Sequence, residues 1–350
     1  MTKTEGFAAC LVRWQQEHGR NQLPWQGTRD PYRVWLSEIM LQQTQVSTVI
    51  DYFARFTARF ADVRALAQAH EDEVMGLWSG LGYYTRARNL HRCAQVVVAQ
   101  HGGQFPRDAA TLATLPGIGR STASAIASIC FGERVAILDA NVKRVVSRVF
   151  AFEGDLSQTK QERALWALAE QLLPGEETAS AQMPRYTQGM MDLGATLCTP
   201  KNPQCPSCPV HAMCKGADAD PTLFPVRSRK LQRSSEQVWA LWLQGPDGAV
   251  WLQQRPAQGI WARLYCLPVW NTQAPLEAVL AGRLAKAARE DLPVFLHVLT
   301  HKDLHIHPVR VRVQDAKAVT LEEGAWYAPD AWRKLGLPAP VRKLLESGIA

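Results

Sequence analysis

The sequence lacks several features that mark special classes of protein. No stretch approaches the roughly 18 consecutive apolar residues of a membrane span. The first residues, Met1-Thr2-Lys3-Thr4-Glu5, lack the basic and then apolar order of a signal peptide. Gly and Pro number only 23 and 21 of 350 residues, and 47% of the chain is hydrophobic, which excludes a collagen-like or disordered chain. We therefore expect a soluble, cytoplasmic protein of one large domain or two ordinary ones.

Excess charge is scarce in the first part of the chain. Lys+Arg and Asp+Glu number 22 and 21 over residues 1–226, whereas they number 17 and 11 over residues 227–350. Four of the later basic residues lie within seven positions: Arg227, Arg229, Lys230 and Arg233. A basic run of this kind permits a polyanionic partner but is more typical of a solvated linker.

The periodicity of apolar residues changes along the chain. They recur at helical spacing almost continuously from residue 7 to about 195, for example over 31–56. Beyond about 235 a strand-like pattern dominates, with one helix expected at 276–289. The sequence thus predicts a nearly all-α domain at 1–216, a linker at 217–234 and a smaller α+β domain at 235–350.

Clustered cysteines form the most specific motif. Four of the eight cysteines fall within 17 residues: Cys198, Cys205, Cys208 and Cys214. Because disulfides are rare in the cytoplasm, a metal centre is favoured, and zinc or a four-iron cluster can each use four sulfurs. The spacing leaves that choice open. Its order of six, two and five intervening residues resembles the [4Fe–4S] loop of the endonuclease III superfamily of DNA glycosylases.

A glycine-rich string, Leu115-Pro116-Gly117-Ile118-Gly119-Arg120-Ser121-Thr122-Ala123, separates two predicted helices. We expect both glycines to allow positive φ, and Ser121 or Thr122 to cap the second helix, whose amides can then bind a phosphate. A tight turn between packed helices explains the glycines equally well. The string resembles the helix-hairpin-helix motif of the same superfamily, which implies DNA contacts at Gly117, Gly119, Arg120 and Ser121.

Two carboxylic acids occupy informative positions. Asp139 precedes a predicted helix and is expected to cap it, with amide hydrogen bonds that keep its pKa low. Glu38 shares a helix face with Trp35 and Gln42, an environment expected to raise its pKa. The plainer alternatives are a cap without catalytic function and a solvated glutamate. A protonated acid and an ionised carboxylate are the pair that glycosidic bond cleavage needs.

Together these motifs resemble the MutY-type adenine DNA glycosylases. The likeness also covers Leu23-Pro24-Trp25 and the segments 35–45, 80–84, 138–144 and 191–195. It implies a helix-hairpin-helix glycosylase domain with a C-terminal [4Fe–4S] loop, its cluster held by the four cysteines, followed by a Nudix-like domain. The implied reaction removes adenine mispaired with 8-oxoguanine or guanine and leaves an abasic site.

The resemblance also implies catalytic roles. Glu38 would protonate N7 of adenine, Asp139 would stabilise the sugar cation, and Asn141 would orient the catalytic groups. Ser121 stands where the related oxidised-pyrimidine glycosylases have a lysine that attacks the sugar as a Schiff-base nucleophile. Because a hydroxyl cannot form that imine, we expect a monofunctional enzyme that uses water.

Four further positions match the family's contacts to the base and its surroundings. Gln43 and Tyr83 match residues that wedge into the base stack where the adenine leaves the duplex. Leu23 and Trp25 match the lining of the adenine pocket, although apolar positions of this kind are also typical of a core.

The C-terminal domain is expected to recognise 8-oxoguanine. Leu299-Thr300-His301 matches a Phe-Ser-His loop of the family, so Thr300 keeps the hydroxyl whereas Leu299 loses the aromatic ring. Arg289-Glu290-Asp291 is the nearest approach to a Nudix box and lacks the rest. Nucleotide hydrolysis by this domain is therefore not expected.

The expected partner is double-stranded DNA containing A:8-oxoguanine or A:G mispairs, bound by a monomer at the nucleoid and not at a membrane. We expect local basic groups to hold it: Arg86, Arg88, Lys143, Arg144 and Arg148. Two alternatives are an oxidised-pyrimidine glycosylase with lyase activity, disfavoured by Ser121, and a non-catalytic DNA-binding protein with structural zinc. The latter leaves Glu38 without a role.

Overall fold

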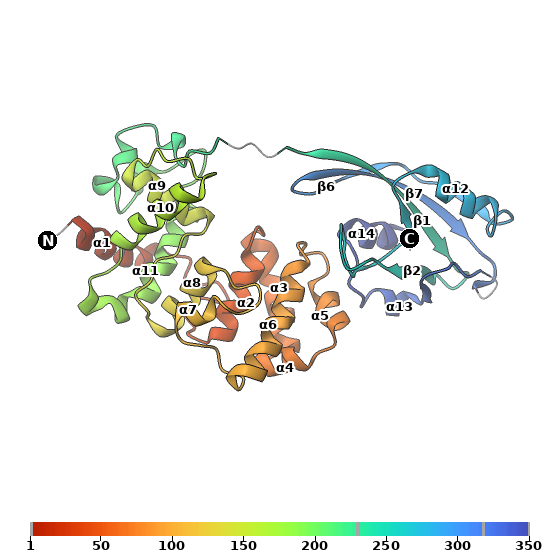
Figure 1. Ribbon diagram of the computed structural model, residues 1–350, viewed down its shortest axis with the longest axis horizontal. Helices are drawn as coiled ribbons and strands as arrows, with labels where there is room; N and C mark the ends of the chain where they lie inside the picture. The colour runs from red at the N-terminus through yellow and green to blue at the C-terminus, as the bar shows by residue number, and fades with distance from the viewer. Residues whose placement is uncertain (1–2, 229–231, 317–318, 349–350) are drawn as a thin grey trace. The chain divides into compact units, whose positions relative to one another are not determined.

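The computed structural model describes residues 3–228, 232–316 and 319–348, so Arg229 and Lys230 of the basic run lie outside the described residues. The chain divides into two compact units (Figure 1). The first unit combines Met1–Gln68 with Asn89–Lys230, and the second combines Ala69–Arg88 with Leu231–Ala350. The second unit thus recruits a short segment from the helical half of the sequence.

The described chain before residue 197 is helical, as predicted. Its helices are α1 (Lys3–His18), α2 (Pro31–Leu41), α3 (Val46–Arg59), α4 (Val63–Gln68), α5 (Glu71–Trp78), α6 (Thr85–His101), α7 (Ala109–Leu112), α8 (Arg120–Phe131), α9 (Ala140–Phe150), α10 (Thr159–Gln171) and α11 (Glu176–Thr196). Short 3₁₀ turns follow: η1 (Cys205–Ser207), η2 (His211–Met213), η3 (Lys215–Ala217) and η4 (Pro221–Leu223). Within the described ranges, none of the helices has the length and hydropathy of a bilayer span.

The helical pattern over 31–56 corresponds to two helices, α2 and α3. Asp30 caps α2 by accepting a hydrogen bond from the Tyr32 backbone N–H at 3.0 Å, and Pro31 occupies the first turn. The helix ends at Leu41 because Gln43 adopts a left-handed backbone with φ of 57°. Apolar periodicity continues across the break, which is why the sequence pattern did not reveal it.

The core of the first unit surrounds α9 and α11. Buried apolar side chains of α1, α9, α10 and α11 form one cluster that includes Leu11, Val145, Leu165 and Leu193. Gly194 of α11 lies against the first turn of α9, where a Cβ atom would stand 2.7 Å from Asn141 Cβ. Close approach of these two helices therefore depends on a residue without a side chain.

The second unit is a mixed sheet with helices on both faces. Its strands are β1 (Ser234–Gln244), β2 (Val250–Gln254), β3 (Tyr265–Cys266), β4 (Val269–Trp270), β5 (Ala288–Asp291), β6 (Phe295–Val298), β7 (Lys302–Arg312) and β8 (Ala325–Tyr327), and its helices are α12 (Gln273–Ala281), α13 (Pro329–Trp332) and α14 (Ala339–Ser347). The order β3-β2-β1-β7-β5 forms the central path. The parallel β1–β7 pair runs in register from Ser234 opposite Lys302 to Gln244 opposite Arg312.

Two apolar cores flank this sheet. Trp242 of β1 packs with Trp332 of α13 and Val341 of α14 on one face. Leu243 packs with Leu276 of α12 on the other face. Neighbouring residues of one strand thus point to opposite cores, as a sheet buried on both sides requires.

The helix expected at 276–289 is shorter than predicted. It starts earlier, at Gln273, and ends at Ala281, where Gly282 forms the C-cap. Arg289 instead lies in β5, which pairs antiparallel with β7. The glycine ends the helix before the strand begins.

Helix α5 and the segment that follows it are tied to the C-terminal part of the second unit. The Ser79 hydroxyl donates to the Leu337 carbonyl at 2.9 Å, and the Tyr84 hydroxyl donates to the same oxygen at 2.8 Å. Gly76 lies so close to the Lys334 carbonyl that a Cβ atom would stand 2.0 Å from it. The loop that carries Tyr83 is therefore anchored by main-chain acceptors of the C-terminal segment.

The contact of Gly194 with α9 yields a prediction. Gly194→Ala is expected to destabilise the protein by about 1–3 kcal/mol, because the added methyl group overpacks the start of α9. Urea unfolding measures this loss. Gly6→Ala is the matched control: a Cβ there meets only Met213 Sδ at 3.5 Å, so stability should stay equal or rise slightly. Equal effects of both variants would contradict the crowding at Gly194.

Candidate active site

A pocket of about 440 Å³ opens beside α2 in the first unit. Glu38 lies in its wall, together with Ser37 and Val34 from the same helix. Other lining side chains come from α1, the loop before α2, α8 and α11: Gln15, Gln16, Asn21, Trp25, Gln26, Thr28, Arg29, Ile129, Pro184, Arg185 and Gln188. Glu38 is therefore a pocket residue and not part of a solvated helix face.

The surroundings of Glu38 change its acidity. Burial, and then the negative charge of Asp139, raise the pKa of Glu38 from 4.5 to about 7, while the Arg20 guanidinium opposes this shift. The expectation of a raised pKa is confirmed. A substantial fraction of Glu38 is thus protonated near neutral pH and can donate that proton.

Asp139 caps α9 as predicted. Its carboxylate accepts a hydrogen bond from the Val142 backbone N–H at 2.7 Å. The expectation of a low pKa is wrong, because burial raises the pKa of Asp139 above its usual range. The backbone N–H groups of Val142 and Asn141 and the charges of Arg144 and Lys143 act in the opposite direction and favour the carboxylate.

Residues around Asp139 hold it in place. Ser121 accepts a hydrogen bond through its hydroxyl from the Leu138 backbone N–H at 3.0 Å, so it supports the segment that enters the cap. Asn141 lies in the first turn of α9, and its Oδ1 accepts a hydrogen bond from Arg144 at 2.8 Å. Arg144 also donates to the carbonyls of Gly194 and Cys198. The start of α9 is thereby connected to the end of α11.

The two residues expected to line the adenine pocket behave differently. Trp25 is 6% exposed, lines the pocket beside Glu38, and meets Phe53 edge-on with ring centroids 5.4 Å apart. Leu23 is half-buried in the turn before Trp25 and is not among the lining residues. The structure therefore brings Trp25, but not Leu23, to the wall that contains Glu38.

The glycine hairpin differs from the expectation in two details. Gly117 has a positive φ of 76° and would collide with Asn89 if it had a Cβ atom, whereas Gly119 has a φ of −84°. Gly119 itself is the N-cap of α8 and makes no side-chain cap, so the prediction that Ser121 or Thr122 caps the helix is wrong. Arg120 is exposed, forms an ion pair with Glu170 at 3.0 Å and stacks on Trp166.

Both expected wedge residues have left-handed backbones. Gln43 is exposed in the break between α2 and α3 with a φ of 57°. Tyr83, in the second unit, is 45% exposed with a φ of 48°. Residues other than glycine rarely adopt such angles, and strain of this kind concentrates at functional sites.

The expected lesion-reading loop connects β6 to β7. Thr300 and His301 are both exposed there, and the Thr300 hydroxyl lies 2.7 Å from the Tyr83 hydroxyl. Leu299 is partly buried and packs against the core beneath α13 and α14. The loop thus presents a hydroxyl and an imidazole to solvent, whereas its leucine points inward.

Three arginines that were expected to bind DNA are instead buried and contact other parts of the protein. Arg148 is 2% exposed and donates to the carbonyls of Thr199 at 2.7 Å and Pro200 at 3.0 Å. Arg144 is buried at the α9–α11 contact, and Arg86 is buried over the rings of Trp78 and Tyr83. The expectation of DNA contacts at these arginines is wrong, because their guanidinium groups are inside the fold.

The cysteine loop surrounds a small cavity after α11. Cys198, Cys205, Cys208 and Cys214 all line it, are partly buried, and form no disulfide. Arg148 donates a hydrogen bond to Cys198 Sγ at 3.3 Å. In the described residues, no three His, Cys, Asp or Glu side chains are grouped so as to hold a metal ion as they stand. Four free thiols around one cavity, with a cation beside them, are nevertheless a donor set that fits an iron–sulfur cluster.

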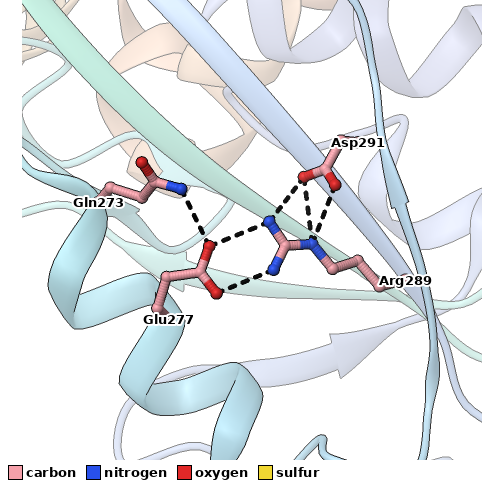
Figure 2. Close-up of polar contacts among 4 residues, drawn as sticks. All are labelled: Gln273, Glu277, Arg289 and Asp291. Carbon is pink, nitrogen blue, oxygen red and sulfur yellow. Dashed lines mark hydrogen bonds and ion pairs between the residues drawn. The ribbon is translucent and has the colours of Figure 1, made fainter.

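The sheet of the second unit places the remnant of a Nudix box in ion pairs (Figure 2). Arg289 of β5 donates to both carboxylate oxygens of Glu277 at 2.8 and 3.0 Å and also to Asp291. These carboxylates are therefore neutralised by an arginine. The expectation that this unit does not hydrolyse nucleotides stays a prediction.

Three further residues near the pocket were not predicted from the sequence. Gln188 lines the pocket, and its Nε2 donates to Asp192, which is fully buried. Arg20 forms an ion pair with Asp192 at 2.7 Å. The one signal available was an acidic residue within the apolar Met191-Asp192-Leu193 sequence, which belongs in a core only when paired.

Comparison with known proteins bears on this geometry. A family model described as HhH-GPD superfamily base excision DNA repair protein matches residues 36–171, and one described as NUDIX domain matches 238–347. The adenine DNA glycosylase of Buchnera aphidicola subsp. Schizaphis graminum is 34% identical over 345 residues, which cover 97% of this chain and 98% of that protein. The chain belongs to the adenine DNA glycosylases.

Other relatives agree. The human adenine DNA glycosylase is 43% identical over 228 residues, which cover 61% of this chain and 40% of the human protein. The solved structure of a thermostable thymine-DNA glycosylase is 29% identical with a TM-score of 0.53, and the match covers 62% of this chain and 97% of that one. The predicted helical glycosylase domain, the Nudix-like domain and DNA N-glycosylase activity in base excision repair are thereby confirmed for this adenine DNA glycosylase, and its substrate is DNA.

The raised pKa of Glu38 makes a stability prediction. The folded protein binds this proton more tightly than the unfolded chain does. Protonation of Glu38 therefore stabilises the fold fully below pH 4.5, and this stabilisation is lost as the pH rises through about 7. Glu38→Gln should therefore gain about 3 kcal/mol of unfolding free energy relative to wild type between pH 4.5 and 8. Urea unfolding at both pH values measures this difference.

A matched control responds in a different pH range. Hydrogen bonds from Arg289 lower the pKa of Glu277, so the stabilisation by this carboxylate is lost only as the pH falls below 4.5, and the stability difference between Glu277→Gln and wild type should change little between pH 4.5 and 8. A pH-independent difference for Glu38→Gln would contradict the burial of its carboxyl group.

Proposed function

We propose that this adenine DNA glycosylase hydrolyses the N-glycosidic bond of adenine mispaired with 8-oxoguanine or guanine and leaves an abasic site. The observation that carries the proposal is the pairing of Glu38, in a pocket wall with a pKa of about 7, with Asp139 at a helix N-terminus. The location at the nucleoid, the monomeric state and the division at 216 and 235 stay predictions.

The proposed reaction divides two roles between the carboxyl groups. A base enclosed by the pocket receives the proton of Glu38 at N7, which makes it a better leaving group. Asp139 is proposed to act as the carboxylate that stabilises the sugar cation left behind; burial raises its pKa, and the helix amides and neighbouring cations oppose that rise. Water then completes the hydrolysis, since Ser121 cannot form an imine with the sugar.

The remaining site residues are proposed to support this reaction. Asn141, fixed by Arg144, orients the catalytic groups, and Trp25 closes one side of the pocket. Gln43 and Tyr83 are proposed to enter the base stack. Thr300 and His301 are proposed to contact 8-oxoguanine. Leu23 is proposed to support the turn that holds Trp25 beside the base.

The hairpin and the cysteine loop are proposed to position the protein on DNA. Gly117, Gly119, Arg120 and Ser121 belong to the hairpin at the start of α8, whose backbone amides suit a phosphate. Cys198, Cys205, Cys208 and Cys214 would hold a [4Fe–4S] cluster. When bound, the cluster supplies a rigid cross-link for the loop and no step of the hydrolysis.

Excision assays test the function. Duplexes with adenine opposite 8-oxoguanine or guanine should break after alkali under single-turnover conditions, whereas adenine opposite thymine should stay intact. Glu38→Gln should lower the rate by about 10²–10⁴, because the proton donor is lost. Full activity of this variant would show that another group is the acid.

The same reactions distinguish the lyase alternative. Quenching them with borohydride should leave no covalent protein–DNA adduct, since no lysine attacks the sugar. A large trapped fraction would instead favour the oxidised-pyrimidine type of mechanism.

Spectroscopy tests the cluster. The purified protein should be brown, with broad visible absorption, and Cys198→Ser should lose most of it because one of four ligands is gone. Cys10→Ser is the matched control, since Cys10 lies in α1 outside the loop, and it should keep the colour. A colourless wild-type protein that contains zinc would refute the cluster assignment.

A further inference from the structure

Asp192 of α11 is a buried carboxylate close to the pocket without being part of its wall. Its side chain is 0% exposed and accepts three hydrogen bonds, from Arg20 Nε at 2.7 Å, the Arg20 backbone N–H at 3.1 Å and Gln188 Nε2 at 3.1 Å. A buried charge is tolerated only when it is paired and hydrogen-bonded in this way. The Arg20 guanidinium is therefore held at a fixed place.

Both partners of Asp192 act on the pocket. Gln188 lines it together with Glu38, and the positive charge of Arg20 lowers the pKa of Glu38. Several other titratable groups face Glu38: Asp139 from the start of α9, Arg29 and Arg185 from the pocket wall, and Cys130 from α8. Asp192 is the carboxylate that balances Arg20 within this group.

We propose that Asp192 is a positioning residue for the glycosylase reaction, which fixes Arg20 and balances its charge so that Glu38 keeps its proton at neutral pH. This inference rests on the proposed role of Glu38 as the acid. It adds the Arg20–Asp192 ion pair, which lies behind the pocket wall, to the groups that control catalysis.

Opposite charge changes should move the pH profile in opposite directions. Asp192→Asn keeps the shape and the acceptor oxygen but leaves the charge of Arg20 unbalanced, so Glu38 should lose its proton at lower pH. Arg20→Gln leaves Asp192 unbalanced, so Glu38 should keep its proton to higher pH. The double variant restores neutrality and should return the profile toward that of wild type.

Single-turnover excision from an A:8-oxoguanine duplex, measured across pH, tests the proposal. The midpoint at which the rate falls should drop by about one pH unit for Asp192→Asn and rise by about one for Arg20→Gln. Above both midpoints, Asp192→Asn should be about tenfold slower than wild type. Glu277→Gln, which breaks another arginine ion pair in the second unit, should leave the midpoint unchanged.

The outcomes distinguish failure of the positioning role from failure of the proposed function. If Glu38→Gln abolishes excision but the Asp192 and Arg20 variants keep the wild-type midpoint, or both move it the same way, the positioning role is wrong. If Glu38→Gln is fully active, the proposed function fails first. If Asp192→Asn does not fold, two other results still test the proposal. The midpoint should rise for Arg20→Gln and stay near that of wild type for the neutral double variant.

Discussion

Two carboxyl groups that repel each other, Glu38 in a pocket wall and Asp139 at the start of α9, cannot both be charged without an energetic cost, and much of this protein is arranged around that constraint. The fold resolves it by treating the two groups differently. Asp139 lies at the N-terminus of α9, where burial raises its pKa but amides and cations act against that rise. Glu38 lies in the middle of α2, where burial and the neighbouring anion favour the acid. Amides and cations thus oppose the effect of burial at Asp139, whereas a neighbouring anion adds to it at Glu38.

The scaffold behind this pair is built from main-chain acceptors. Arg144 connects Asn141 to the carbonyls of Gly194 and Cys198, and Arg148 donates to carbonyls of the segment after α11. Buried guanidinium groups with several carbonyl partners are rigid, because each lost hydrogen bond would leave an unpaired polar group. The cysteine loop and the cap of α9 are consequently parts of one connected structure in the first unit.

Much of this was predictable from the sequence, since the signals are local. Asp139 follows an apolar run and precedes a helix, and Glu38 has an aromatic residue on its own helix face, so both placements could be inferred. The helix break at Gln43 could not, because apolar periodicity continues through it. Nor could the fate of Arg148: a sequence shows a positive charge but not whether carbonyls of a distant loop surround it.

The pKa of Asp139 is another property that the sequence alone could not predict. Its cap hydrogen bond was foreseeable from one residue and its neighbours, whereas the burial that outweighs this bond comes from helices distant in sequence. Arg20 and Asp192 are 172 positions apart and meet only in the folded chain. Local rules thus find the candidate catalytic residues, and tertiary structure decides their protonation.

The left-handed backbones of Gln43 and Tyr83 bear on the role proposed for them in the base stack, and through it on the speed of searching along DNA. A residue held in such a conformation by its surroundings has few alternatives left, so its conformational entropy is lost during folding and not at each encounter with a duplex. In the role proposed for these two residues, an enzyme that must inspect many normal pairs for each damaged one gains from a backbone that is already fixed.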